Sequence, residues 1–316
     1  MKIPLKLAVV SPCYNETDVI NDSARRLTEL FENLIGKHKI APDSFVLYVN
    51  DGSKDDTWEK LKVIHHANQS IKAINLAHNV GHQSAIMAGM MTVRENVDAV
   101  ITIDADLQDD LNAIEKMIDA HENGAEIVYG VKVSREADSA MKKLSAQMFY
   151  KLLKTMGVET IYNHADFRFM SRLALDILAN YKERNLYLRG VIPQIGLKTA
   201  TVDDVISPRL AGSSKYTLGK MLKLASNGVT AFSTRPIEMI IYVGLFMLLI
   251  ALGMFVHVMV SLLTNHYTVG WASLMLSLWF VGAVLILAIG VVGTYIGKVF
   301  IEVKQRPLYS IAEKLM

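Results

Sequence analysis

Short apolar runs alternate with amphipathic stretches over the first 130 residues of the chain. The apolar runs predict strands over Leu5–Val10, Phe45–Val49, Ile71–Leu76, Ala99–Ile103 and Glu126–Gly130. The stretches between them have helical spacing, and the predicted helices end near residues 35, 66, 94 and 121. Strands that alternate with helices at this spacing favour an α/β fold with a mainly parallel sheet and right-handed crossovers.

Two much longer apolar stretches follow, from Ile237 to Leu263 and from Trp271 to Ile296. Beyond Glu238 at the start of the first, neither contains Asp, Glu, Lys or Arg. Each exceeds the ~20 residues that a helix needs to cross a bilayer. A buried pair of soluble helices would also be apolar, but this length favours two transmembrane helices.

The segment before the first span has apolar residues at helical spacing, among them Leu218, Met221 and Leu222. We expect an amphipathic helix on the inner leaflet, although a core-facing helix would show the same periodicity. The predicted organisation is a globular domain over 1–215, an interfacial helix and linker over 216–236, a two-helix transmembrane domain over 237–300 and a C-terminal tail over 301–316.

Charge gives the orientation and excludes some functions. The connection over 264–270 lacks Lys and Arg, whereas basic residues flank both spans, so the positive-inside rule places both flanks in the cytoplasm. A net charge of +2 argues against a nucleic-acid partner. The single cysteine, Cys13, excludes an internal disulfide and fits a reducing compartment.

Carboxylates come directly after the fourth predicted strand, at Asp104 and Asp106. Parallel sheets bind ligands at the carboxyl ends of their strands. Two oxygen ligands one residue apart suit a divalent ion that is shared with substrate phosphates. An acidic helix start would contain the same residues, because Asp is favoured at helix caps.

Two other strand ends carry polar residues, at Asn15-Glu16 and at Asn50-Asp51-Gly52. Asp51 is placed to accept hydrogen bonds from a nucleobase or ribose, and Gly52 permits a sharp turn. Ordinary turn chemistry would select the same residues. Ser53 and Asp56 together predict the start of the next helix.

Several motifs resemble the family 2 glycosyltransferases. They are Pro12-Cys13-Tyr14-Asn15-Glu16, Asn50-Asp51-Gly52-Ser53, Asn79-Val80-Gly81-His82 and Asp104-Ala105-Asp106-Leu107-Gln108-Asp109. Later segments are similar to the polyprenyl-phosphate glycosyltransferases: Asp166 to Arg172, Arg184 to Gly190, Arg209 to Tyr216, and the two terminal helices followed by Arg306-Pro307. The resemblance covers nearly the whole chain. It implies the GT-A nucleotide-diphospho-sugar transferase fold.

The resemblance also implies the reaction and its residues. A nucleotide-sugar gives its sugar to a lipid phosphate with inversion at the anomeric carbon. The expected catalytic residues are Asp104, Asp106 and Asp166, and the expected metal residues are Asp106 and Gln108, with Mg or Mn as the ion. The expected donor-binding residues are Pro12, Tyr14, Asn15, Glu16, Asp51, Gly81, Gln83, Asp104 and Ala105.

The acceptor chemistry lowers the need for a base. A phosphate monoester has a second pKa near ~6, so it is already largely nucleophilic at neutral pH. Many relatives that join sugars have a Glu-Asp pair where this chain has Ala165-Asp166. Asp166 is therefore a base or a group that orients Arg168, and both roles stay open. The cations expected at the acceptor phosphate are Lys132, Arg135, Arg189, Arg209 and Lys215.

Two other functions fit the sequence less well. A processive polysaccharide synthase usually carries a Gln-x-x-Arg-Trp motif, which is missing here, and a non-catalytic nucleotide-sugar-binding regulator would not need the aspartate pair. We expect a multi-pass protein of the bacterial inner membrane with both termini cytoplasmic, a UDP-sugar donor in preference to GDP, and undecaprenyl phosphate as acceptor. The sugar, a homo-oligomer and a downstream flippase are left open by the sequence.

Overall fold

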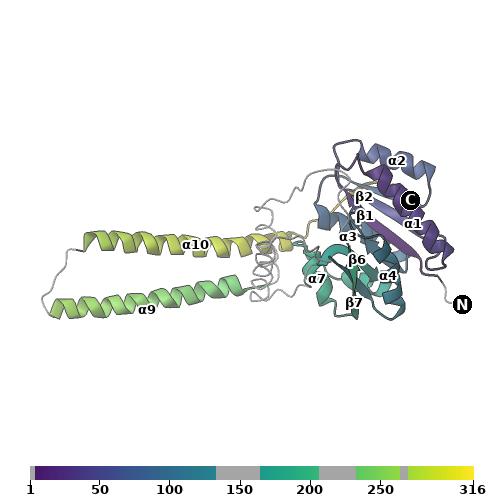
Figure 1. Ribbon diagram of the computed structural model, residues 1–316. Coiled ribbons are helices and arrows are strands. Elements are labelled where there is room, and N and C mark those ends of the chain that lie inside the picture. The colour runs from purple at the N-terminus through teal and green to yellow at the C-terminus, as the bar shows by residue number, and fades with distance from the viewer. Residues whose placement is uncertain (1–3, 133–163, 206–232, 264–269) are drawn as a thin grey trace.

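A computed structural model describes residues 4–132, 164–205, 233–263 and 270–316. It consists of a sheet domain covered by helices and a pair of long helices. Figure 1 shows the two long helices lying side by side and extending away from the sheet domain. The predicted features that fall outside these ranges are Arg135, Arg209, Lys215 and the amphipathic helix expected over 216–232.

Four parallel strands form the centre of the sheet: β1 (Leu7–Cys13), β2 (Phe45–Asn50), β3 (Ile71–Leu76) and β4 (Ala99–Thr102). All seven residues of β1 are buried, with Leu7 and Val9 in one hydrophobic cluster and Ala8 and Val10 in the other. This alternation follows from the two-residue period of a strand. Both faces of the sheet are therefore covered, which explains why the central strands are continuous apolar runs.

The other four strands are β5 (Ile127–Lys132), β6 (His164–Ser171), β7 (Thr199–Asp204) and β8 (Ile311–Leu315). The order in the sheet is β7-β5-β6-β4-β1-β2-β3-β8. β6 runs antiparallel between β4 and β5, and β8 runs antiparallel to β3. The expectation of a mainly parallel α/β sheet is confirmed, and β6 adds an antiparallel strand that brings a second group of polar residues to the end of β4.

Helices cover both faces of the sheet. One face carries α1 (Ile20–Gly36), α2 (Thr57–Ala67) and α4 (Asn112–Glu122), and the other carries α3 (His82–Val93), α6 (Arg172–Leu178) and α7 (Leu188–Gln194). A short 3-10 helix, η1 (Arg94–Asn96), follows α3. α3 packs closely on the sheet at Gly89, where a Cβ atom would collide with side chains of Val10 and Val49. This packing fixes the N-terminus of α3 at the carboxyl ends of the strands.

The start of α2 differs from the prediction. The helix begins at Thr57, and Asp56 at its N-cap makes no side-chain capping hydrogen bond, so the helix start predicted from Ser53 and Asp56 is wrong. The Ser53 hydroxyl instead accepts the backbone N–H of Asn15. Ser53 therefore forms a tertiary contact between two turns instead of the helix cap that its local sequence pattern predicts.

The long helices are α9 (Arg235–Leu263) and α10 (Trp271–Lys304). Each contains an apolar window, at Arg235–Met254 and Ser277–Lys304, with a mean hydropathy of 2.3, and no part of either window is buried inside the protein. Both helices are long and apolar enough to cross a membrane, and their exposure is unlike that of core helices. The segment 301–316, expected as a tail, forms the end of α10 and then β8 at the edge of the sheet.

Candidate active site

A pocket of about 430 Å³ lies at the carboxyl ends of β1, β2 and β4. Four carboxylate residues line it, and we call it the acidic pocket. The lining residues are Pro12, Cys13, Tyr14, Glu16, Asp51, Asn79, Gly81, His82, Ala85, Asp104, Ala105 and Asp106. Seven of the nine residues expected to bind the donor are in this set, and Asn15 and Gln83 are the other two.

Asp51, at the end of β2, shapes the wall of the acidic pocket. It is 3% exposed, and its carboxylate accepts the backbone N–H groups of Val80 at 2.7 Å and Gly81 at 3.0 Å. Gly52 has a φ of +61°, and a Cβ atom there would lie 2.6 Å from the backbone nitrogen of Asn79. The sharp turn expected at Gly52 is confirmed. Asp51 holds the 79–81 loop in place, and a direct contact with the nucleotide stays a prediction.

Asn15 joins two turns at the rim of the acidic pocket. Its φ is +54°, its side chain accepts the backbone N–H of Lys54 at 2.9 Å, and its own N–H reaches the Ser53 hydroxyl at 2.9 Å. Left-handed backbone is tolerated by Asn better than by most residues. Asn15 therefore positions Tyr14 and Glu16, which line the pocket on either side of it.

The two aspartates after β4 lie on a tight turn. The N–H of Leu107 donates to the carbonyl of Asp104 at 3.1 Å, and Leu107 is buried with a φ of +44°. Non-glycine residues with positive φ are uncommon and cluster at functional sites. The turn leaves Asp104 with 54% of its side chain exposed and places both Asp104 and Asp106 on the pocket wall.

These two carboxylates fit a divalent ion whose other ligands come from the substrate. Within the part of the chain that the structure describes, no group of three or more His, Cys, Asp or Glu residues forms a closed metal site. Mg²⁺ typically uses one or two carboxylates together with substrate phosphates and water. Asp104 and Asp106 supply that donor set, whereas Gln108 lies beyond the residues that line the pocket.

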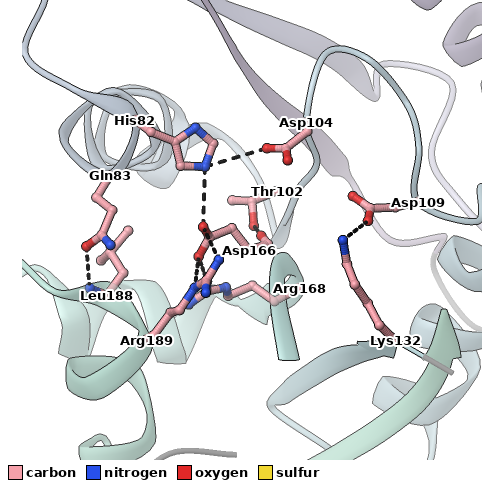
Figure 2. A network of polar contacts seen from close by, with 10 residues as sticks. All are labelled: His82, Gln83, Thr102, Asp104, Asp109, Lys132, Asp166, Arg168, Leu188 and Arg189. Atoms are coloured by element: carbon pink, nitrogen blue, oxygen red, sulfur yellow. Dashed lines mark hydrogen bonds and ion pairs between the residues drawn. The ribbon is translucent and has the colours of Figure 1, made fainter. Parts of the chain in front are cut away.

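Asp166 on β6 is the centre of an ion-paired network (Figure 2). Its carboxylate contacts a guanidinium nitrogen of Arg168, Arg189 at 3.1 Å and Nε2 of His82 at 3.3 Å. The pairing of β6 with β4 brings Asp166 there, and the Thr102 hydroxyl donates to its backbone carbonyl. The expected pairing of Asp166 with Arg168 is present, and Arg189 joins it.

The network determines the charge of Asp166. Burial alone would raise the pKa of this carboxyl, but the hydrogen bond from His82 and the charges of Arg168 and Arg189 outweigh it and hold the pKa well below its usual range. A carboxylate held in this state is a poor proton acceptor. The geometry favours the orienting role for Asp166 over the role of general base.

His82 is a site residue that sequence reasoning underrated. Its Nε2 lies 3.5 Å from Asp104 and 3.3 Å from Asp166, so it bridges the two carboxylates. Burial lowers the pKa of His82, but the hydrogen bond to Asp166 and the charges of Asp104 and Asp166 raise it overall. The available signal was its place in Asn79-Val80-Gly81-His82, directly after a glycine with a φ of +89° and at the start of α3.

Of the five cations expected at the acceptor phosphate, two are described. Arg189 contacts Asp166, and Nζ of Lys132 lies 3.7 Å from Asp109. Burial, and then the charge of Asp104, raises the pKa of Asp109 to about 8 against the opposing charge of Lys132. Both cations therefore lie close to the carboxylates of the site, and their contact with an acceptor stays a prediction.

A second pocket of about 340 Å³ adjoins the first and shares Gly81 and His82 with it. We call it the basic pocket, because Arg184 and Lys298 line it and no carboxylate is among its lining residues in the described ranges. Gln83 belongs to this pocket, and its side-chain oxygen accepts the N–H of Leu188 at 2.9 Å (Figure 2). Gln83 thus joins α3 to α7, and its contact with the donor stays a prediction.

Known proteins resemble this chain over almost its whole length. It is 43% identical over 305 residues to an uncharacterized glycosyltransferase of Bacillus subtilis (strain 168), YkoT, covering 96% of this chain and 90% of that protein. It is 33% identical over 309 residues to the SfII prophage-derived bactoprenol glucosyl transferase of Shigella flexneri, covering 97% of each. Among solved structures, the mannosyltransferase PcManGT of Pyrobaculum calidifontis is 15% identical with a TM-score of 0.49, covering 94% of this chain and 85% of that one.

Residues 8–189, which contain the acidic pocket and the Asp166 network, match the family model described as glycosyl transferase family 2. The mixed, mainly parallel sheet with its acidic pocket at the strand ends is the GT-A arrangement that the motifs imply. The chain is therefore a glycosyltransferase and belongs to glycosyl transferase family 2.

Proposed function

We propose that this glycosyltransferase transfers a sugar from a nucleotide-sugar, with UDP as the favoured nucleotide, to undecaprenyl phosphate at the cytoplasmic face of a bacterial membrane. The transfer inverts the anomeric carbon, and its product is a lipid-linked sugar for cell-envelope glycosylation. Relatives whose names include bactoprenol glucosyl transferase support a polyprenyl-phosphate acceptor and make glucose the first sugar to test.

The observation that carries this proposal is that α10, a helix long and apolar enough to cross a membrane, is hydrogen-bonded to a loop beside the acidic pocket. Glu302, near the end of α10, accepts the backbone N–H groups of Arg184 at 2.9 Å and Asn185 at 2.7 Å. Arg184 and Asn185 line the basic pocket, which adjoins the acidic pocket. A lipid phosphate at the membrane surface would thus lie near the sugar donor without leaving the bilayer.

The residues divide the chemistry between them. Asp104 and Asp106 would hold a divalent ion, Mg or Mn, which when bound stabilises the negative charge that develops on the leaving nucleoside diphosphate. The acceptor phosphate needs no strong base, because it is already ionised near neutral pH. Asp166, fixed as a carboxylate, would hold Arg189 and His82 in position beside the reacting groups.

The test is sugar transfer into an organic extract. Membranes that contain the protein would be incubated with undecaprenyl phosphate, Mg or Mn and labelled UDP- or GDP-sugars, with and without a chelator. We expect label in the organic phase that depends on the lipid and disappears with the chelator. Label in a long water-soluble polymer would support a processive synthase, and donor binding without transfer from any sugar would contradict the enzymatic role.

A further inference from the structure

The basic pocket lies between the sheet domain and the end of α10. Its walls are the start of α3, the loop from Arg184 to Tyr187, and Lys298 of α10. Two basic side chains line it, and no aspartate or glutamate is among the lining residues that the structure describes. Such a pocket selects an anion over a neutral sugar or a metal ion.

The start of α3 adds a second source of positive potential. His82, Gln83 and Ser84 are the first three residues of this 12-residue helix, and all three line the basic pocket. The N-cap is Gly81, which has no side chain to cap the helix and whose own N–H donates to Asp51. The N–H groups and dipole at such a helix terminus favour a phosphate.

Arg184 supplies an independent observation. Its Nε atom is buried and has no hydrogen-bond partner among the described residues. Buried polar groups are nearly always paired, and Arg184 is a lining residue of the basic pocket, so its guanidinium group has hydrogen-bonding capacity that the described residues leave unused. A guanidinium group binds phosphate oxygens with two parallel hydrogen bonds.

The loop is held in place by atoms other than these charged groups. Glu302 accepts the backbone N–H groups of Arg184 and Asn185, and the Asn185 side chain donates to Glu302 at 3.2 Å and to the backbone carbonyl of Lys298 at 3.3 Å. Removing the charge of Arg184 or Lys298 would therefore leave these hydrogen bonds intact.

We propose that the basic pocket binds the phosphate monoester of the polyprenyl-phosphate acceptor, with Arg184 and Lys298 as its cationic ligands. This assignment rests on the proposed function, and it adds two residues to the cations expected from the sequence. The pocket shares Gly81 and His82 with the acidic pocket, so a phosphate there lies next to the donor site. Lys298 belongs to the apolar helix, which places the site where a membrane lipid can present its head group.

The test compares two double variants of the full-length protein in nanodiscs of neutral phosphatidylcholine. Arg184→Gln with Lys298→Gln removes both charges from the pocket. Lys182→Gln with Lys304→Gln is the matched control, because it removes one exposed lysine from the same loop and one from the same helix. Binding of undecaprenyl phosphate, and separately of phosphatidylglycerol, is measured by native mass spectrometry, and initial rates give KM for donor and lipid.

We expect the pocket variant to bind undecaprenyl phosphate at least about tenfold more weakly and to show a matching rise in lipid KM, since charge-assisted hydrogen bonds are lost. Donor KM should change by less than about twofold, and the control should behave as the unmodified protein. Arg184→Lys should recover part of the binding, which a misfolded loop would not do.

Unchanged binding of undecaprenyl phosphate in the pocket variant would overturn the assignment. A loss that is equal for phosphatidylglycerol, or larger for it, would also overturn it, because the pocket would then be a general phospholipid site. If the unmodified protein transfers no sugar to undecaprenyl phosphate, the proposed function fails, while the binding comparison still decides what the pocket holds.

Discussion

The two adjoining pockets differ in charge although they share Gly81 and His82. The acidic pocket is lined by Glu16, Asp51, Asp104 and Asp106, without Lys or Arg among its described residues, whereas the basic pocket has Arg184 and Lys298. One is suited to a cation that accompanies a nucleotide diphosphate, and the other to an anion.

The origin of the pockets explains the difference. The acidic pocket is built from the ends of β1, β2 and β4 and from the start of α3, all within the first 106 residues of the chain. The basic pocket needs α10, which follows β4 by about 170 residues in the chain. In the proposed function, the sheet edge supplies the donor chemistry and α10 completes the site for the acceptor.

The largest expected effect comes from Asp106, which we propose as a metal ligand in the acidic pocket. Asp106→Asn should lower kcat on the order of 10³-fold, because stabilisation of the leaving diphosphate by a bound ion is worth several kcal/mol. Initial rates of sugar transfer, with membrane insertion checked by fractionation, measure this. Asp119→Asn, on the outer surface of α4, is the control and should retain full activity. A near-normal rate for Asp106→Asn would contradict the proposal that Asp106 binds the metal ion.

The second effect concerns Asp166, beside both pockets. Asp166→Asn leaves Arg168, which is 1% exposed, without its carboxylate partner, and should cost about 3–5 kcal/mol of stability. Asp176→Asn breaks the exposed ion pair with Arg172 and should cost less than about 1 kcal/mol. Thermal unfolding in detergent, followed by tryptophan fluorescence, compares the two variants. Equal shifts would mean that the Asp166 network is not structural.

The same carboxylate gives a pH dependence with a definite sign. The folded-state pKa of Asp166 is lowered, so its contribution to stability is complete above the unfolded-state pKa of ~3.9 and is lost as the pH falls through the folded-state pKa. The unmodified protein should lose stability below about pH 4. Asp166→Asn should remove part of that dependence, and an unaltered acid profile in the variant would contradict the network's charge state.

A smaller effect is expected at the join between α10 and the basic pocket. Glu302→Gln weakens the hydrogen bonds that position Arg184 and Asn185, and should raise the KM for the lipid about fivefold without changing that for the donor. Glu313→Gln is the control. Glu313 lies on β8, accepts the Trp58 indole N–H and is not a lining residue of either pocket. A parallel rise in donor KM would show that Glu302 supports both pockets.

The smallest effect is a difference in thiol reactivity. Cys13 lines the acidic pocket, and burial together with the charges of Glu16, Asp55 and Asp51 raises its pKa, so iodoacetamide should not label it in the folded protein at pH 8. In Ser84→Cys the new thiol would line the basic pocket at the start of α3, where a thiolate is favoured, and should be labelled within minutes. Mass spectrometry counts the labels, and equal reactivity would contradict the burial of Cys13 and the raised pKa of its thiol.

The sequence by itself determined the parts of this protein that depend on local pattern. The four central strands, the aspartates at the end of β4, the glycine turn at Gly52 and the two long apolar helices all follow from residue periodicity and backbone preference. Such features are encoded within about 20 neighbouring residues, so a single sequence is enough to predict them.

The tertiary structure alone decided which distant groups meet. His82, Asp104, Asp166 and Arg189 come together because β6 inserts antiparallel beside β4, and Arg184 meets α10 because Glu302 binds the loop backbone. Tertiary contacts likewise give the Ser53 hydroxyl a partner in another turn, and they join the Gln83 side chain to α7. Strand order and helix docking are set by burial summed over the whole domain, which no local pattern records.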